Sequence, residues 1–194
     1  VTGVQTLLFR SLIHAANSKL PLQGASDHLV SEAIYLADPE GNGIEVYADR
    51  PRLGWFDAGG RLKMGTEALD LKDLASAATG PWQGAPEGAV VGHVHLQAGD
   101  VAEATTFWRD VIGLPVMAQY PGAAFFGSGG YHHHIGANVW NSRGAGPRAL
   151  PSTGLAELVL LTDPAEHQAI AARAGGNSFA DPWGTPVTLQ QKAA

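Results

Sequence analysis

The sequence contains no cysteine among its 194 residues. This absence excludes a disulfide scaffold, a thiolate zinc site and a cysteine nucleophile. Any metal ion must therefore be bound by histidine, aspartate, glutamate or water, and such ligands suit Fe(II), Mn, Ni or Zn.

Long apolar runs and clusters of basic residues are also missing. No apolar stretch approaches the ~20 residues of a transmembrane helix, and the N-terminus lacks the layout of a signal peptide. The formal net charge is -6 without a Lys/Arg run, so neither nucleic acid nor membrane is an expected partner. We therefore expect a cytoplasmic protein, whose 45% hydrophobic residues can form the core of one or two domains.

Strands and helices follow one another in regular order in the second half of the chain. Residues 90–97 alternate between apolar and polar side chains, which predicts a strand. Asp100 is placed to cap a helix over residues 101–112, and Gly113 to end it. Further strands are predicted at residues 116–120, 123–127 and 132–140. The result is one β-α-β-β-β unit.

A second unit is predicted after the first. A strand at residues 155–161 precedes a helix that begins at Asp163-Pro164, with proline at the first helical position, and ends at Gly175. The remaining strands of this unit are predicted at residues 177–180 and 187–190.

One turn motif occurs twice in the chain. Ala37-Asp38-Pro39-Glu40-Gly41 parallels Ala180-Asp181-Pro182-Trp183-Gly184. Proline fixes one φ angle of such a turn and glycine accepts a positive φ, which explains the residue types. An internal repeat at this spacing indicates duplicated structural units.

Paired β-α-β-β-β units with a terminal Asp-Pro-x-Gly-Asn-x-Ile-Glu strand resemble the vicinal oxygen chelate superfamily, which contains glyoxalases, bleomycin-resistance proteins and extradiol dioxygenases. The two-domain, catechol 2,3-dioxygenase-like members are the most similar. The segments that carry the resemblance are residues 26–36, 38–51, 92–96 and 129–136. It implies an α+β fold in which paired βαβββ modules form a half-barrel cup around a metal ion, commonly bound by two histidines and one glutamate.

The resemblance divides the chain into a partial N-terminal module (1–52), a linker (53–89) and a complete C-terminal domain (90–194) of two βαβββ units. The chain thus resembles an N-terminally truncated member. Residues 4–8 take the place of the opening strand, which in the family carries a histidine ligand, and a helix is expected near residues 11–18.

Glu45 matches the carboxylate ligand of the family, but its two histidine partners are missing from the first half. We therefore hypothesise a homodimer in which the lone module pairs with its mate from a second chain.

Alternation of strand side chains predicts which histidines face the cup. If the apolar residues of two strands face the helix, the cup receives His93, His95, His132 and His134. The resemblance places Glu157 at an opening-strand ligand position, whereas Thr188 stands where glutamate is expected. The candidate metal ligands are His93, His134 and Glu157, with His132 and His95 as alternates. The competing interpretation is that residues 131–134 form a partly solvated strand edge.

Asp27-His28, with Ser31, Tyr35 and Glu45, resembles the acid/base segment of extradiol dioxygenases. The resemblance implies that His28 and Tyr35 are catalytic, since histidine exchanges protons near neutral pH. A structural role for His28 is the alternative. Trp140 and Phe126 are expected to line the cup beside a ring substrate.

The implied function is oxygen-dependent ring cleavage of a catechol-like, oxygen-chelating aromatic substrate, with Fe(II) as the first candidate metal and Mn, Ni or Zn as alternatives. Superfamily membership does not fix function. A non-catalytic small-molecule binding or resistance-type protein and an inactive truncated homologue are therefore the alternatives.

Overall fold

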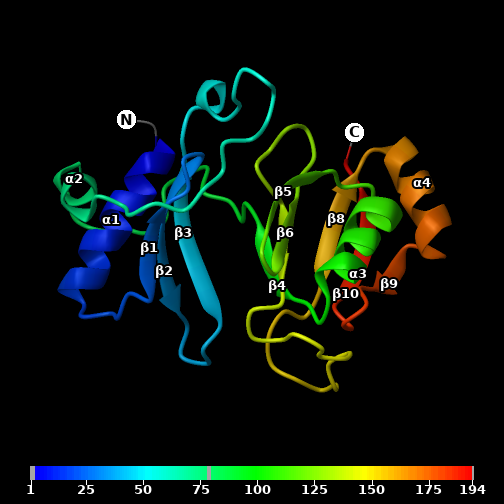
Figure 1. The fold of residues 1–194 in the computed structure, drawn as a ribbon. Helices are drawn as coiled ribbons and strands as arrows, with labels where there is room; N and C mark the ends of the chain where they lie inside the picture. Colours follow the sequence, from blue (N-terminus) through cyan, green and yellow to red (C-terminus); the bar gives the residue numbers. More distant parts are fainter. Residues whose placement is uncertain (1–2, 78–79, 194) are drawn as a thin grey trace. The chain divides into compact units, whose positions relative to one another are not determined.

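The computed structural model describes residues 3–77 and 80–193. The chain divides into two compact units, unit 1 (Val1–Val91) and unit 2 (Gly92–Ala194). Each unit combines helices with its own β-sheet structure, so the fold is mixed α+β as predicted (Figure 1). Among the helices described, none has the length and apolar character that crossing a membrane requires.

Unit 1 is built on a three-stranded antiparallel sheet in the order β1-β2-β3. Its elements in chain order are α1 (Gly3–Asn17), β1 (Gly24–Asp27), β2 (Ser31–Ala37), β3 (Gly43–Asp49), the 3-10 turn η1 (Arg52–Gly54) and α2 (Leu71–Ser76). A helix followed by three strands is the order of a βαβββ module after its opening strand.

The prediction of a strand at residues 4–8 is wrong, because this segment lies inside helix α1. The helix also begins well before residue 11, where it was expected. Leu8 and Leu12 stand one helical turn apart and pack with Ile34 and Ala48 of the sheet in one buried cluster. Burial of this apolar stripe against the sheet stabilises the helix.

The segment after β3 packs onto unit 1, so the linker interpretation is wrong for residues 53–77. The Trp55 side chain is buried, and its indole N–H donates to the Arg50 carbonyl at 2.9 Å. Leu74 of α2 belongs to the same buried cluster as α1. Because two large side chains of this segment are buried in unit 1, the segment is part of that unit and is not a free linker between domains.

The first module of unit 2 has the predicted β-α-β-β-β order. Its elements are β4 (Val94–Gln97), α3 (Val101–Thr105), the π-helical η2 (Thr106–Ile112), β5 (Val116–Tyr120), β6 (Ala123–Phe126) and β7 (Ile135–Asn138). The sheet order is β4-β7-β6-β5, with β4 parallel to β7. The helix limits are confirmed, since Asp100 accepts from the Glu103 N–H at 2.8 Å and Gly113 ends the helix at a φ of 92°.

The second module repeats this plan with two strands after its helix. Its elements are β8 (Leu158–Thr162), α4 (Pro164–Ala174), β9 (Ser178–Ala180) and β10 (Pro186–Gln191). The sheet order is β8-β10-β9, and β8 runs parallel to β10. In both modules the first strand therefore lies beside the last, as a helical crossover between parallel strands allows.

The repeated Asp-Pro turn has the same hydrogen bonds in both units, which confirms the turn prediction. The Asp38 carboxylate accepts from the backbone N–H groups of Glu40 and Asn42 at 2.9 and 2.8 Å. Asp181 accepts from Trp183 and Thr185 at 3.0 and 2.7 Å. Asp38 is partly exposed and Asp181 is buried, so the second turn forms part of the core of unit 2.

The two modules of unit 2 share one hydrophobic core. Trp108 of η2 and Phe126 of β6 are fully buried, and they cluster with Ile170 of α4 and Val187 of β10. The expectation that Phe126 lines a cup is therefore wrong. Its side chain points into the core, and its neighbour Phe125 takes the other face of the strand.

Candidate metal centre

The prediction of a strand from residue 132 is wrong, because β7 begins only at Ile135. Residues 131–134 instead form a loop that follows Gly127. A Cβ at Gly127 would lie 2.4 Å from the Tyr131 carbonyl oxygen, so the loop folds back tightly onto the chain. The alternation of strand side chains does not apply in this loop, and the faces predicted for His132 and His134 do not follow.

Three imidazoles come together in unit 2: those of His93, His95 and His133. One ring nitrogen from each lies within 4.8 Å of the other two. Nε2 of His133 lies 3.4 Å from Nε2 of His95, and the ring centroids of His93 and His133 are 4.2 Å apart. We call these three side chains the imidazole cluster. It is the group with metal-binding geometry in the part of the chain that the structure describes.

The spacing of two nitrogens of the cluster fits a metal ion. Two nitrogens that each lie about 2.1 Å from a tetrahedral metal are about 3.4 Å apart. This is the separation found between His95 and His133. His133 is 6% exposed and His95 lies on the exposed face of β4. One side of the cluster is therefore anchored in the protein and the other can be reached by a small molecule.

Hydrogen bonds of the backbone bring the histidine loop beside β4. The N–H of His134 donates to the Phe126 carbonyl at 2.7 Å, and the His134 carbonyl accepts from the Val94 N–H at 2.9 Å. This residue therefore ties β4 and β6 to the loop. Its neighbour His133 is placed against His93 and His95 as a result.

An aromatic side chain closes one side of the cluster. Phe125 of β6 is buried, and its ring meets His133 at 5.0 Å and His95 at 5.7 Å between centroids, edge to face. Tyr120 continues this wall at 5.7 Å from Phe125. Apolar surface beside the imidazoles can contact the ring of an aromatic ligand.

His132 lies behind the cluster and is fully buried. Its Nδ1 is 2.8 Å from Nδ1 of His133, and its ring is tilted against Tyr131 at 4.2 Å. His133 thus has one nitrogen toward His95 and the other toward His132.

The predicted set of His93, His134 and Glu157 is not brought together. Nδ1 of His134 accepts from the Ser128 N–H at 3.2 Å. Burial lowers the pKa of His134, and its coulombic interaction with His132 and His93 lowers it further. Glu157 is exposed and accepts a hydrogen bond from the Thr188 hydroxyl. The described group that could hold a metal ion contains His93, His95 and His133 instead.

His133 was missed because the strand was extended too far towards the N-terminus. The signal that could have found it is the run Gly127-Ser128-Gly129-Gly130. Gly129 and Gly130 adopt φ angles of 58° and 70°, and such a run favours a loop over a strand.

A second polar group lies in unit 1. Nε2 of His28 is 2.6 Å from the Tyr35 hydroxyl, which lies 3.3 Å from the Glu45 carboxylate. Nδ1 of His28 is 2.7 Å from the Gly65 carbonyl oxygen. That oxygen can only accept, so Nδ1 donates to it, and the Tyr35 hydroxyl donates its proton to Glu45. We call His28, Tyr35 and Glu45 the proton chain.

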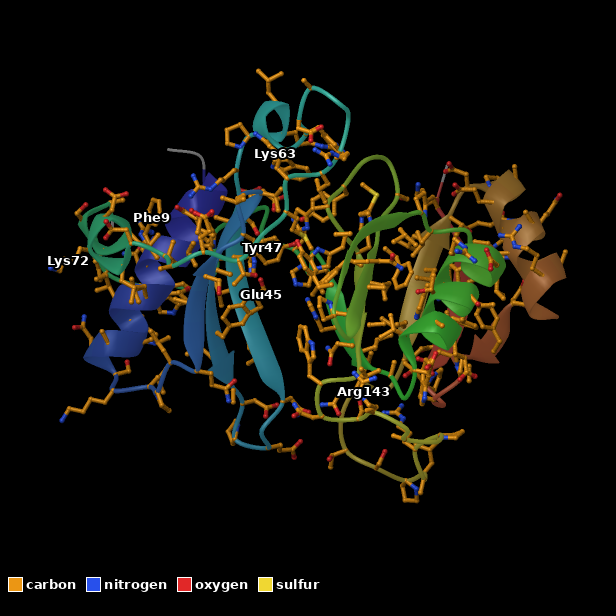
Figure 2. The ribbon with its side chains drawn as sticks, in the orientation of Figure 1. Phe9, Glu45, Tyr47, Lys63, Lys72 and Arg143 are labelled. Carbon is orange, nitrogen blue, oxygen red and sulfur yellow. The ribbon has the colours of Figure 1, made fainter. Side chains whose placement is uncertain are left out.

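Tyr35 stays protonated at neutral pH. Burial raises its pKa, and the negative charge and hydrogen bond of Glu45 raise it further. Glu45 lies on β3, two residues before Tyr47, and both side chains extend from that strand (Figure 2). Among the described residues, the group that could hold a metal ion does not include Glu45.

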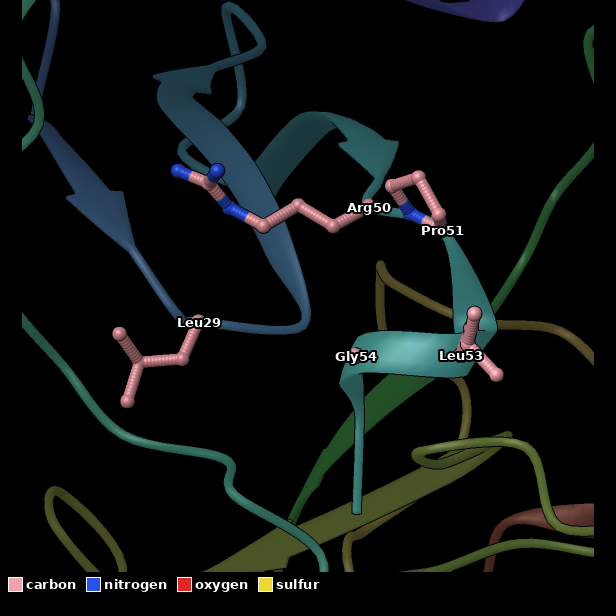
Figure 3. A pocket seen from close by; sticks show the side chains of 5 residues that line it. All are labelled: Leu29, Arg50, Pro51, Leu53 and Gly54. Carbon is pink, nitrogen blue, oxygen red and sulfur yellow. The ribbon is translucent and has the colours of Figure 1, made fainter. Parts of the chain in front are cut away.

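An open hollow of about 480 Å³ also lies on unit 1 (Figure 3). It is lined by Leu29, Arg50, Pro51, Leu53 and Gly54. The Arg50 guanidinium is held by Asp27 and Glu32 at 2.7 and 2.8 Å. None of the predicted catalytic or metal-binding residues lines this hollow.

Comparison with known proteins gives one family and one curated relative. Residues 90–192 match the family model described as the Glyoxalase/Bleomycin resistance protein/Dioxygenase superfamily. The chain is 41% identical over 170 residues to a protein named Catechol-2,3-dioxygenase from Bacillus subtilis (strain 168). This match covers 80% of the chain and 60% of that relative, so the chain spans well under the whole length of the relative.

Similarity to solved structures is weaker. A glyoxalase/dioxygenase from Nostoc punctiforme is 14% identical with a TM-score of 0.46, covering 60% of this chain and 100% of that one. A lactoylglutathione lyase from Agrobacterium tumefaciens is 21% identical with a TM-score of 0.40, covering 55% and 95%. At these TM-scores the similarity does not bear on function.

Proposed function

Because the chain belongs to the Glyoxalase/Bleomycin resistance protein/Dioxygenase superfamily, we propose that it is a metal-dependent dioxygenase that cleaves the ring of a catechol-like substrate. The observation that carries the proposal is the convergence of His93, His95 and His133. It occurs in a chain that shares 41% identity with a protein named Catechol-2,3-dioxygenase.

The three histidines would hold one divalent ion. Neutral imidazole suits iron, nickel, copper and zinc, and three protein ligands leave positions open for a bidentate substrate. We propose Fe(II), with Mn, Ni or Zn as alternatives. When bound, the ion would supply Lewis acidity toward the two substrate oxygens and an electron path to dioxygen.

The protein itself would orient the substrate and limit access of water. Phe125 packs against His95 and His133, which keeps the rings from turning away. Tyr120 is partly exposed beside Phe125. We propose that it contacts the face or edge of the aromatic substrate.

We propose that His28 and Tyr35 of the proton chain are acid/base residues. The Tyr35 hydroxyl lies 2.6 Å from Nε2 of His28 and donates to Glu45 at 3.3 Å. Burial and Glu45 keep Tyr35 protonated at neutral pH, so its hydroxyl has a proton to give. The proposed homodimer would be tested by the mass from light scattering.

The test is an anaerobic loading with Fe(II), followed by metal analysis and then by addition of oxygen and a panel of catechols. We expect stoichiometric iron, consumption of oxygen and a ring-opened product. A His133→Ala variant that folds normally serves as the control and should lose both metal and product. If the chain binds iron but neither consumes oxygen nor opens any catechol, its function is better explained as non-catalytic binding of a small molecule.

A further inference from the structure

The hydrogen bond between His132 and His133 joins two nitrogens of the same kind. Their Nδ1 atoms are 2.8 Å apart, and a hydrogen bond of this length needs one proton between them. In a neutral imidazole one nitrogen carries the proton and the other a lone pair. The tautomer of one ring therefore fixes the tautomer of the other.

Only one of the two arrangements makes His133 a metal ligand. If the shared proton belongs to Nδ1 of His133, its Nε2 has a lone pair directed toward His95 at 3.4 Å. If the proton belongs to Nδ1 of His132, Nε2 of His133 must carry a proton of its own. That proton would point into the imidazole cluster and block coordination.

We propose that His132 is a positioning residue, which accepts the Nδ1 proton of His133 and thereby holds His133 in the tautomer that a metal ion requires. This inference rests on the metal role of the imidazole cluster in the proposed function. Ligand histidines commonly donate their second N–H to a carboxylate, a carbonyl or water, which orients the ring and raises its basicity. Here the buried His132 is the acceptor of that N–H group.

The surroundings of His132 suit an acceptor with a fixed orientation. The side chain is 0% exposed, so water does not compete for Nδ1. The Tyr131 ring lies against the imidazole at 4.2 Å and limits its rotation. A ring held in this way imposes its tautomer on His133, whose own side chain is 6% exposed.

The first test reads the tautomers directly in the full-length chain. Nitrogen-15 NMR of labelled histidines distinguishes protonated ring nitrogens from lone-pair and metal-bound ones. In the zinc-loaded protein we expect His132 to carry its proton on Nε2, and His133 to carry its proton on Nδ1 with Nε2 bound. Protonation of Nδ1 in His132 would overturn the inference whatever the enzyme activity.

The second test compares two substitutions by zinc affinity, measured by competition with a chelator. His132→Leu removes the acceptor, and we expect zinc affinity to fall by about 10- to 100-fold. His132→Asn places an amide oxygen near the position of Nδ1 and should restore most of the affinity. His167→Gln is the matched control, because His167 hydrogen-bonds Asn177 in the same unit, away from the cluster.

Each outcome separates this inference from the proposed function. Equal zinc affinity in both His132 variants, whether normal or reduced, would overturn it if circular dichroism shows intact folds. If His132→Leu does not fold, the NMR measurement on the unsubstituted chain decides. Zinc binding with the expected tautomers but no ring cleavage after iron loading would overturn the dioxygenase proposal alone. A chain that binds no divalent ion would overturn both.

Discussion

The imidazole of His95 lies across the backbone of Gly136, its partner on the neighbouring strand β7. A Cβ at position 136 would be 2.8 Å from Nδ1 of His95 and 2.9 Å from the adjacent ring carbon. The absence of a side chain on Gly136 thus creates the space in which the His95 ring approaches His133. The geometry of the imidazole cluster depends on a residue that offers no ligand atom.

Substitution of Gly136 by alanine should therefore weaken metal binding by displacing the His95 ring. We expect a decrease in zinc affinity of about tenfold, since the changed residue acts through the orientation of a ligand. Isothermal titration of the full chain measures it. Gly146→Ala is the matched control, because no atom lies within 4 Å of a Cβ at that position. Equal affinities in the two variants would mean that the position of the His95 ring is not limiting.

The neighbours His133 and His134 should differ sharply in their contribution to metal binding. His133→Ala removes a cluster nitrogen, and we expect the metal affinity to fall by at least about 100-fold. His134→Ala should retain the metal, because Nδ1 of His134 accepts from the Ser128 N–H instead of joining the cluster. Elemental analysis of both variants, purified without a histidine tag, checks this. Loss of metal in His134→Ala alone would favour the ligand set predicted from strand alternation.

Tyr35 should make the stability of the protein fall at alkaline pH. Its pKa is raised in the folded state, first by burial and then by Glu45, whereas in the unfolded chain it is about 10. The stability present below pH ~10 is therefore lost as the pH rises above that value. We expect a contribution of no more than about 1 kcal/mol at pH ~11, because Tyr35 is only partly buried and water screens the effect.

Urea denaturation between about pH 8 and 11, compared with Tyr35→Phe, measures this dependence. The variant should have the shallower decline in stability over this interval. The same pH dependence in both proteins would show that the Tyr35 phenol titrates in the ordinary range.

The two copies of the Asp-Pro turn should differ in their importance for stability. Asp181→Ala leaves the N–H groups of Trp183 and Thr185 without their acceptor in a buried turn, which costs about 1–3 kcal/mol. Asp38→Ala removes equivalent bonds in an exposed turn, where water replaces the carboxylate. We expect the first variant to unfold at clearly lower urea concentration than the second. A larger effect of Asp38→Ala would contradict the difference in burial.

Much of unit 2 could be predicted because its signals are local. Asp100 and Gly113 define the ends of one helix, and Asp163-Pro164 and Gly175 those of the other, since caps act within a single turn of chain. In unit 1, the same local reasoning failed at residues 4–8. Leu8 is buried by a sheet formed from residues farther along the chain, which a pattern of five residues does not reveal.

The sequence by itself determined which metal-ligand atoms are available, the repeated turn and the modular order of helices and strands. These features depend on residue type and short-range geometry. It also indicated that histidines of the second half belong together. The tertiary structure decided which histidines meet. His133 reaches His93 and His95 because the loop after Gly127 leaves strand geometry and because Gly136 makes room for a ring. Both conditions concern contacts between segments that are distant in the sequence. The alternation of side chains along one strand cannot predict such contacts.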